Sequence, residues 1–304
     1  KMRKNFYVTT PIYYVNDKPH IGHAYTTILA DVLNRFYQIN GYDTFFLTGL
    51  DEHGQKVQEA AKKKNVEPLK HCDEMVPQFK NLWEKLHISN NDFIRTTEAR
   101  HVSIVQDILT KVFKKGDIYK DEYKGLYSVS EERFITEKEA ETGDFRDIKR
   151  IKEKNYFFKM SKYQNKLIEY IESNPNFIQP EHRKNEIIGF LRKPLNDLCI
   201  SRPKSRLSWG IELPFDKDYV TYVWFDALIN YLTGIGYKKD KKLFEKYWPA
   251  TYQLIGKDIL TTHAIYWPTM LMSLEIELPK TIFAHGWWLI SESKMSKSIG
   301  NVID

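Results

Sequence analysis

The chain has 304 residues, and 46 Lys and Arg against 40 Asp and Glu give it a net charge of +6. This mild excess is compatible with an anionic partner but does not identify one. No stretch approaches an uncharged apolar run of about 18 residues, and the first residues enter a strand pattern directly, so we expect neither a membrane partner nor a secretory signal. The two cysteines, Cys72 and Cys199, match no metal or redox spacing. This pattern favours the cytoplasm or an organelle matrix.

The first fifty residues follow the order strand, helix, strand. The segment "NFYVTTPIYY" (5–14) is rich in aromatic and β-branched residues, "AYTTILADVLNRFYQI" (24–39) has helical periodicity, and "DTFFLTGL" (43–50) is typical of a second strand. Such a unit predicts a right-handed βαβ crossover in a parallel sheet. Helical patterns follow to about Lys115.

The pattern changes between Gly116 and Tyr219, where short aromatic and charged segments are broken by turn residues. This stretch predicts an insertion with a small core of its own. An α/β pattern then returns in "YVTYVWFDALINYL", "TYQLIGKD", "ILTTHAIYWPTMLMSL" and "TIFAHGWWLI". We therefore predict an α/β fold, a Rossmann-like parallel sheet with helices on both faces. Its halves (1–115 and 220–304) are interrupted by an inserted α+β domain (116–219).

His20 and His23 fall between the first strand and the first helix, at the carboxyl edge of the predicted sheet, where open α/β folds bind ligands. Amide groups at a helix N-terminus favour an anion, and Gly22 lets a base or ribose approach the main chain. Histidines at positions i and i+3 share one helical face. We therefore predict that the two histidines bind a triphosphate together. The alternative is two unrelated histidines that cap the helix.

A second motif, "SKMSKSIGN" (293–301), places Lys294 and Lys297 among small residues. Their ammonium groups could close on β- and γ-phosphates and neutralise the charge that develops on pyrophosphate. A solvated lysine turn is the alternative. Together with "PHIGH" (19–23), this motif forms the paired signature of class I aminoacyl-tRNA synthetases, which the chain resembles.

Longer segments narrow this resemblance to the methionyl-tRNA synthetases, and they cover nearly the whole chain. They are "TTPIYYVNDKPHIGHAYT", "TGLDEHGQKVQEAA", "EHRKNEIIGFL", "YVWFDALINYL", "IGKDILTTHAIYWP" and "FAHGWWLISESKMSKSIGN". The resemblance implies activation of methionine by ATP with Mg²⁺, giving methionyl adenylate, and transfer to tRNA(Met). It also implies catalysis by positioning and charge stabilisation, through His20, His23, Lys294 and Lys297.

The resemblance also assigns two binding sites. It implies that Asp51 pairs with the substrate ammonium, although Asp51 in "LDEHG" could instead cap a helix. The implied methionine pocket consists of Ile12, Tyr14, Trp224, Ala227, Leu228, Tyr231, Ile259 and His263. Tyr14 and His263 would give the thioether weak hydrogen bonds. The implied ATP site adds Gly22 to the four catalytic residues, and Gly256 and Asp258 at the ribose, where a plain turn is the alternative.

Two features depart from the family. Many relatives carry a zinc knuckle of Cys-x-x-Cys pairs that begins near "GLYSVSEERF", but residues 116–219 hold only Cys199 and His182 as soft or imidazole ligands. Because tetrahedral zinc needs four ligands, we predict no structural zinc. Family members also continue into a helical bundle that holds the anticodon. We therefore expect residues 1–304 to act as a catalytic fragment that charges tRNA poorly.

Other functions fit parts of the pattern. A small-molecule nucleotidylyltransferase shares the sheet and the histidine pair, but it lacks the insertion and the amino-acid pocket. Synthetases for Leu, Ile and Val use a much larger editing insertion. A non-catalytic RNA-binding relative would show broken signatures, whereas both signatures are intact here.

Overall fold

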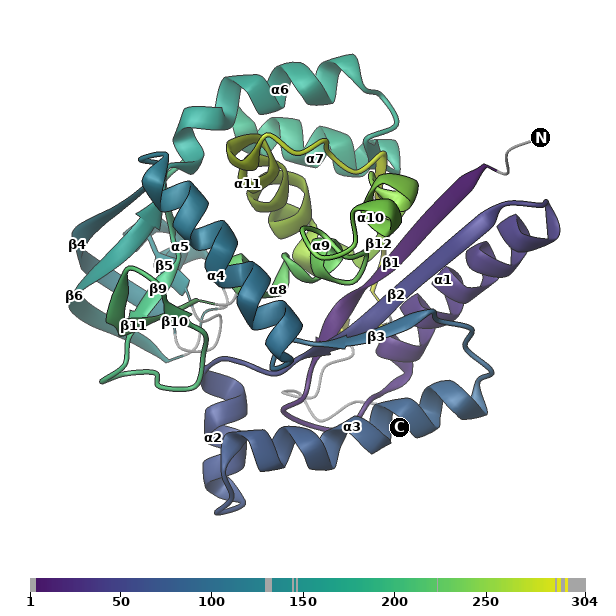
Figure 1. The fold of residues 1–304 in the computed structure, drawn as a ribbon. Helices are drawn as coiled ribbons and strands as arrows, with labels where there is room; N and C mark the ends of the chain where they lie inside the picture. The colour runs from purple at the N-terminus through teal and green to yellow at the C-terminus, as the bar shows by residue number, and fades with distance from the viewer. Residues whose placement is uncertain are drawn as a thin grey trace.

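A six-stranded parallel sheet forms the centre of the computed structural model, which describes residues 4–128, 133–143, 145, 147–222, 224–287, 289–290 and 293–294 (Figure 1). The strand order is β3-β2-β1-β12-β13-β7. The strands are β1 (Asn5–Tyr14), β2 (Asp43–Asp51), β3 (Asp92–Arg95), β7 (Ile178–Gln179), β12 (Tyr252–Gly256) and β13 (Thr281–His285). All neighbouring pairs are parallel, and the two halves of the chain meet where β1 pairs with β12. The predicted Rossmann-like fold is confirmed.

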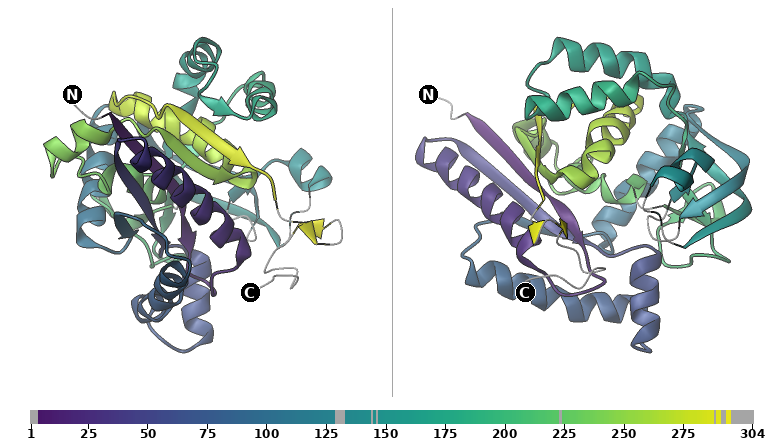
Figure 2. Two further views of the ribbon diagram at one scale, coloured as in Figure 1. Left: turned by 90° about the vertical axis from the view of Figure 1, so that its right-hand side faces the viewer. Right: turned by 180° about the vertical axis from the view of Figure 1, so that it is seen from behind.

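Helices cover both faces of this sheet. On one face, Phe6 of β1 packs in a cluster with Ala30 of α1 (Ile21–Ile39). On the other face, Tyr7 packs in a cluster with Ile235. Successive side chains of a strand point to opposite faces, so a strand covered on both sides is apolar throughout. Figure 2, seen from behind, shows α1 lying along β1 and β2.

The remaining helices of the sheet region fall into two groups. Helices α2 (Gln55–Lys63) and α3 (Pro68–Lys85) pack against the carboxyl ends of β1 and β2. The large core on the face of Tyr7 holds α4 (Ala99–Lys114), α8 (Trp224–Ala227), α9 (Asn230–Thr233), α10 (Lys241–Tyr247) and α11 (Trp267–Leu274). The segment "ILTTHAIYWPTMLMSL" (259–274) has the pattern of a single helix. The structure instead has a 3₁₀ turn, η2 (Lys257–Ile259), and a π-helical turn, η3 (Thr262–Tyr266), before α11.

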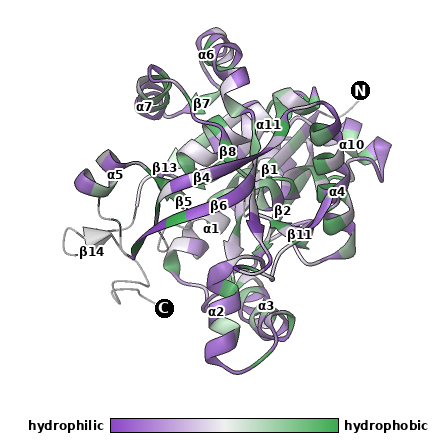
Figure 3. Ribbon diagram, turned by 90° about the vertical axis from the view of Figure 1, so that its left-hand side faces the viewer, coloured by the Kyte–Doolittle hydropathy of each residue, from purple (hydrophilic) through white to green (hydrophobic). Residues whose placement is uncertain are grey.

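The predicted insertion contains two antiparallel sheets. One has the order β5-β4-β6-β8, with β4 (Ile118–Ser128), β5 (Arg133–Ile135), β6 (Ile148–Phe158) and β8 (Leu198–Cys199). The other has the order β10-β11-β9, with β9 (Ser201–Pro203), β10 (Glu212–Leu213) and β11 (Asp216–Thr221). A short helix, α5 (Glu137–Thr142), follows β5. Figure 3 shows that β4 and β6 are hydrophilic over much of their length, which agrees with their exposed middle residues.

The centre of the predicted insertion returns to the main sheet, and here the structure differs from the predicted boundaries. After the turn η1 (Met160–Tyr163), the chain forms α6 (Gln164–Ser173), then β7, then α7 (Glu181–Leu191). Strand β7 pairs with β13, and buried side chains of α6 and α7 join the same core as α4 and α11. Part of residues 116–219 therefore shares the core of the main sheet. A two-residue strand carries no periodicity, so only its distant partner defines it.

The last described residues form a small antiparallel pair, β14 (Leu289–Ile290) with β15 (Ser293–Lys294). Lys294 lies in β15, whereas Lys297 and the rest of the second motif lie outside the described residues. Within the described part of the chain, no helix has the length and apolar character needed to cross a bilayer.

Candidate active site

His20 and His23 together cap the first helix. His20 is the N-cap of α1, and its Nδ1 accepts a hydrogen bond from the amide of Gly22 at 3.0 Å. The Nδ1 of His23 accepts one from the amide of His20 at 3.0 Å. The two rings lie 3.9 Å apart. The histidines thus form a reciprocal capping box, a role that Ser or Thr with Glu usually fills.

This capping arrangement determines where each imidazole proton lies. A ring whose Nδ1 accepts a hydrogen bond is neutral and carries its hydrogen on Nε2. The ring of His23 is also held from the side, because Tyr13 packs edge-on against it at 4.8 Å and donates to, or accepts from, Thr27 at 2.9 Å. The amide of Gly22 is used by His20 in this arrangement, and the predicted approach of a base or ribose at Gly22 stays a prediction. The hydrogen that each neutral ring carries therefore lies on Nε2, on the side of the ring away from the capping bond.

Asp51 ends β2 beside the end of β1. It pairs in register with Tyr14, and it is only 5% exposed. The alternative role as a helix cap is wrong, because the N-cap of α2 is Gly54 and has no side-chain cap hydrogen bond. A carboxylate and a phenol therefore lie side by side at the carboxyl edge of the sheet, one strand away from the histidine pair.

Gly256 and Asp258 lie at the corresponding end of β12. A Cβ atom added to Gly256 would come within 2.5 Å of the Asp258 carboxylate, so this position of the carboxylate depends on the absence of a side chain at residue 256. Asp258 accepts a hydrogen bond from the indole of Trp287 at 3.3 Å, and the Lys257 ammonium lies 3.8 Å from the centre of that indole. Asp258 itself is exposed. The Asp258 carboxylate is therefore exposed to solvent and lies close to the main chain of Gly256, just after β12.

The predicted methionine pocket falls into two groups of residues. Trp224, Leu228, Tyr231 and Ile259 belong to one apolar cluster, in which Leu228 and Tyr231 are fully buried. Ala227 is also buried, whereas Ile12 and Tyr14 are half-buried and belong to β1. The Tyr7 hydroxyl of β1 donates to the Tyr231 carbonyl at 2.8 Å and so links the two groups.

Both nitrogens of His263 have partners inside the protein. Its Nδ1–H donates to the Ile259 carbonyl at 3.0 Å, and its Nε2 accepts from the Tyr231 hydroxyl at 2.7 Å. Burial lowers the pKa of His263 to about 4, so the ring is neutral. A neutral ring has one N–H, which is already used. In this arrangement the one N–H of His263 is engaged with Ile259 and its other nitrogen with Tyr231, so the predicted contact with sulfur is not formed by this N–H and stays a prediction.

Sequence reasoning missed His285, which ends β13. Its Nε2 lies 2.7 Å from the Thr26 hydroxyl of α1, and Tyr25 packs edge-on against its ring at 4.9 Å. The histidine in "FAHGWW" follows a strand pattern directly, so its position at the carboxyl edge was a usable signal. It was also not foreseen that His53, His101 and Asp226 meet in the interior.

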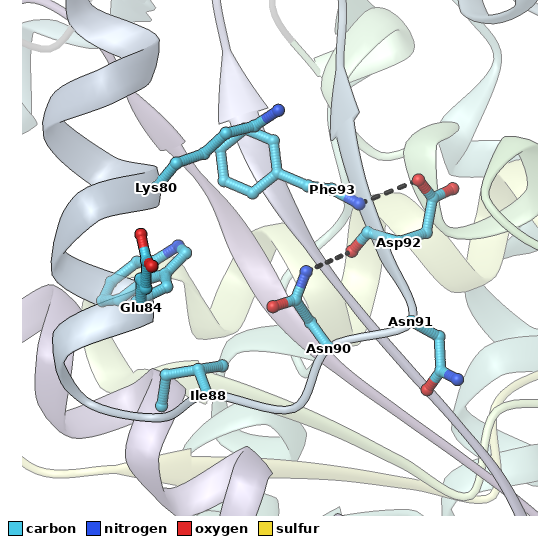
Figure 4. A pocket seen from close by; sticks show the side chains of 8 residues that line it. Lys80, Glu84, Ile88, Asn90, Asn91, Asp92 and Phe93 are labelled. Carbon is cyan, nitrogen blue, oxygen red and sulfur yellow. Dashed lines mark hydrogen bonds between the residues drawn. The ribbon is translucent and has the colours of Figure 1, made fainter.

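A cavity of about 540 Å³ lies away from these residues, at the amino end of β3 (Figure 4). The side chain of Lys80 lies over Phe93 at 5.1 Å, and the Asn90 amide donates to the Asp92 carbonyl at 3.2 Å. Because ligands of open α/β sheets bind at the carboxyl ends of strands, this cavity is not part of the candidate active site. Among the described side chains, no group of three or more His, Cys, Asp or Glu is arranged to hold a metal ion. The predicted absence of zinc stays a prediction.

A Rossmann-like parallel sheet with paired histidines at its first helix is typical of the class I aminoacyl-tRNA synthetases. The comparison with family models agrees with this class. The model described as "tRNA synthetases class I (M)" matches residues 6–143 and 145–304. The chain belongs to this family.

Individual relatives agree with the family match. The chain is 53% identical over 308 residues to the methionine--tRNA ligase of Clostridium tetani, covering 99% of this chain and 48% of that protein. It is 50% identical over 309 residues to the methionine--tRNA ligase of Rickettsia bellii, covering 100% of this chain and 60% of that protein. The chain thus spans about half the length of the Clostridium relative.

Solved structures agree with the fold. The Mycobacterium tuberculosis methionyl-tRNA synthetase in complex with methionyl-adenylate is similar at a TM-score of 0.93 and 46% identity, covering 99% of this chain and 60% of that one. The apo form of the same enzyme gives a TM-score of 0.80 and 43% identity, covering 94% and 57%.

Proposed function

We propose that this chain activates methionine with ATP to form methionyl adenylate, as the catalytic part of a methionine–tRNA ligase. The observation that carries the proposal is the proximity of two kinds of group at one sheet edge. Buried Asp51 ends β2 in register with Tyr14, and β1 leads directly to the histidine cap of α1. An ammonium group at Asp51 would leave the substrate carboxylate free to face a nucleotide at α1.

The reaction needs no side-chain nucleophile. The methionine carboxylate attacks the α-phosphorus of ATP, the bond to the β-phosphate breaks, and pyrophosphate leaves. The Nε2–H groups of His20 and His23 would donate to phosphate oxygens from positions that the capping hydrogen bonds preorganise. Lys294 and Lys297 would neutralise the leaving pyrophosphate from the other side, with Mg²⁺ on the phosphates.

The ribose is assigned to the end of β12. Asp258 is exposed and rests against Gly256, so its carboxylate is able to accept from ribose hydroxyls. The assignment of tRNA(Met) as the final acceptor rests on the names of the relatives. The proposal that the chain works without structural zinc rests on the absence of cysteine from residues 116–198.

Pyrophosphate exchange across the twenty amino acids tests this function. Exchange stimulated by methionine above all others is the expected result. Exchange that does not depend on any amino acid would favour the nucleotidylyltransferase alternative, and no exchange with an intact fold would leave only a binding role. A matched reaction without chain and one with His23→Ala serve as controls for background exchange.

A further inference from the structure

Three buried polar side chains from distant segments meet beside the candidate methionine pocket. His53 follows β2, His101 lies in the first turn of α4, and Asp226 lies in α8 (Figure 1). They are 8%, 0% and 1% exposed. The Nδ1 of His53 lies 2.6 Å from one Asp226 oxygen, and the Nε2 of His101 lies 2.8 Å from the other. Both carboxylate oxygens are therefore held by imidazole groups.

The hydrogen bonds from the two histidines stabilise the negative charge of Asp226. Burial alone would raise the pKa of Asp226, but the nearby His53 and His101 outweigh it and lower this pKa to about 2. Asp226 is thus an acceptor on both oxygens, so each histidine donates to it. On the far side of His101, its Nδ1 lies 3.1 Å from the Thr233 hydroxyl, which in turn lies 3.2 Å from the Ile229 carbonyl. Both ring nitrogens of His101 therefore have partners inside the protein, which fixes the ring between Asp226 and Thr233.

The cluster joins two parts of the predicted pocket. Asp226 shares the single turn of α8 with Trp224 and Ala227, and a helix of four residues has little internal hydrogen bonding to hold it. His53 is two residues beyond Asp51 on the segment that leaves β2. Thr233 ties the same cluster to α9, which carries Tyr231. The wall of the pocket and the carboxylate assigned to the ammonium are therefore connected through Asp226.

We propose that Asp226, gripped by His53 and His101, is a positioning residue that sets the separation between α8 and Asp51 and thereby the affinity for methionine. This proposal rests on the proposed function. Asp226 lies on α8 itself, and both of its carboxylate oxygens are held by histidines, so it would act on methionine through the position of Trp224 and Ala227. Displacing a binding wall by a fraction of an ångström changes ligand affinity even when the fold is intact.

The competing interpretation is an ion pair that only stabilises the core. Asp117 offers a matched control, because it is also a buried carboxylate, at 1% exposure, and has several side-chain partners. It accepts from Lys162 at 2.7 Å and from Ser273 at 2.7 Å, and also from Tyr163. These partners lie in η1 and α11 and include none of the predicted pocket residues. Asp117→Asn therefore measures the effect of a lost buried ion pair without a change at the pocket.

The test compares Asp226→Asn, Asp117→Asn and the unsubstituted chain by pyrophosphate exchange and thermal unfolding. We expect Asp226→Asn to raise the KM for methionine about 10-fold or more and to leave the KM for ATP within about 2-fold. Asp117→Asn should lower the melting temperature but leave both KM values within about 2-fold. Two variants of His53 give a second measurement if Asp226→Asn does not fold. His53→Asn keeps an N–H donor near Nδ1 and should stay close to the unsubstituted chain, whereas His53→Leu should raise the methionine KM.

Each result is decisive. An unchanged methionine KM in Asp226→Asn, or an equal rise in Asp117→Asn, would overturn the positioning role while the exchange activity of the unsubstituted chain upholds the proposed function. The same holds if His53→Asn and His53→Leu behave alike. Absence of methionine-dependent exchange in the unsubstituted chain would instead overturn the proposed function itself.

Discussion

The side chain of His23 accepts a hydrogen bond from the backbone amide of His20, so the two histidines form the cap of the first helix together. The capping alternative and the phosphate-binding hypothesis for this pair are thus compatible. Each ring uses Nδ1 for the cap and keeps its hydrogen on Nε2. The cap is the device that orients the donors.

Asparagine at position 23 separates these two roles. Its side-chain oxygen takes the place of Nδ1 and keeps the cap, but nothing replaces Nε2–H. We expect His23→Asn to lower kcat for pyrophosphate exchange about 100-fold or more, because a donor to the transition state is lost. Methionine affinity by calorimetry and the melting temperature should stay near the values of the unsubstituted chain.

The control for this experiment is His23→Ala, which loses both the donor and the cap. It should fall equally in kcat and also lose about 1 kcal/mol of stability. Full turnover in His23→Asn would show that this histidine serves only the helix.

Asp51→Asn should weaken methionine binding strongly, because an ammonium would then lie in the pocket without its countercharge. Breaking a buried ion pair on one side costs about 3–5 kcal/mol, which is at least about a 100-fold loss of affinity. The hydroxy acid analogue of methionine, which lacks the ammonium, provides the matched ligand. Calorimetry should show that the unsubstituted chain prefers methionine and that Asp51→Asn binds the two ligands alike. A preference that survives in Asp51→Asn would assign the ammonium elsewhere.

Gly256→Ala should act on ATP rather than on methionine. The new methyl group would lie 2.5 Å from the Asp258 carboxylate and displace it. The KM for ATP should rise about 10-fold while the affinity for methionine is retained, since mispositioned contacts weaken binding only where they occur.

Gly189→Ala is a suitable control for that substitution. Gly189 lies within α7, and no atom within 4 Å faces the added Cβ. This change should leave both KM values unaltered and stabilise the chain by about 0.5–1 kcal/mol, because alanine favours a helix. An unchanged ATP KM in Gly256→Ala would argue against a ribose site at Asp258.

His263 makes stability depend on pH. Burial lowers its pKa to about 4 in the folded chain, against an ordinary value of 6.5. The unfolded chain therefore binds the proton first, and the contribution of His263 to stability is complete above about pH 6.5 and is lost as the pH falls toward 4. Between pH 7 and pH 5 the free energy of unfolding should fall by about 2 kcal/mol from this residue alone.

Urea unfolding at the two pH values measures this effect. His263→Asn removes the titrating ring and should reduce the pH-dependent loss by about the same amount. Asp226, with a pKa of about 2, stays ionised over this range and does not contribute. Identical pH slopes for the unsubstituted chain and His263→Asn would mean that the imidazole is charged or exposed in solution.

Much of the first strand–helix–strand unit of the parallel sheet was determined by local sequence. The first strand predicted over 5–14 is observed as Asn5–Tyr14, and the helix predicted over 24–39 is observed as Ile21–Ile39. These elements carry their own periodicity and end signals, so neighbouring residues suffice to define them. The candidate residues His20, His23, Asp51, Gly256 and Asp258 could be placed because each follows such a strand or starts such a helix.

Tertiary structure alone decided the features that depend on distant partners. The two-residue strand β7 exists because it pairs with β13, about 100 residues away in sequence, so its neighbours contain no strand signal. The hydrogen bonds of His263 with Ile259 and Tyr231 determine which ring nitrogen carries its hydrogen. The charge of Asp226 is stabilised by two histidines that lie 173 and 125 residues away along the chain. A residue type predicts which hydrogen bonds a side chain can make, but burial and the chosen partner decide which of them it makes.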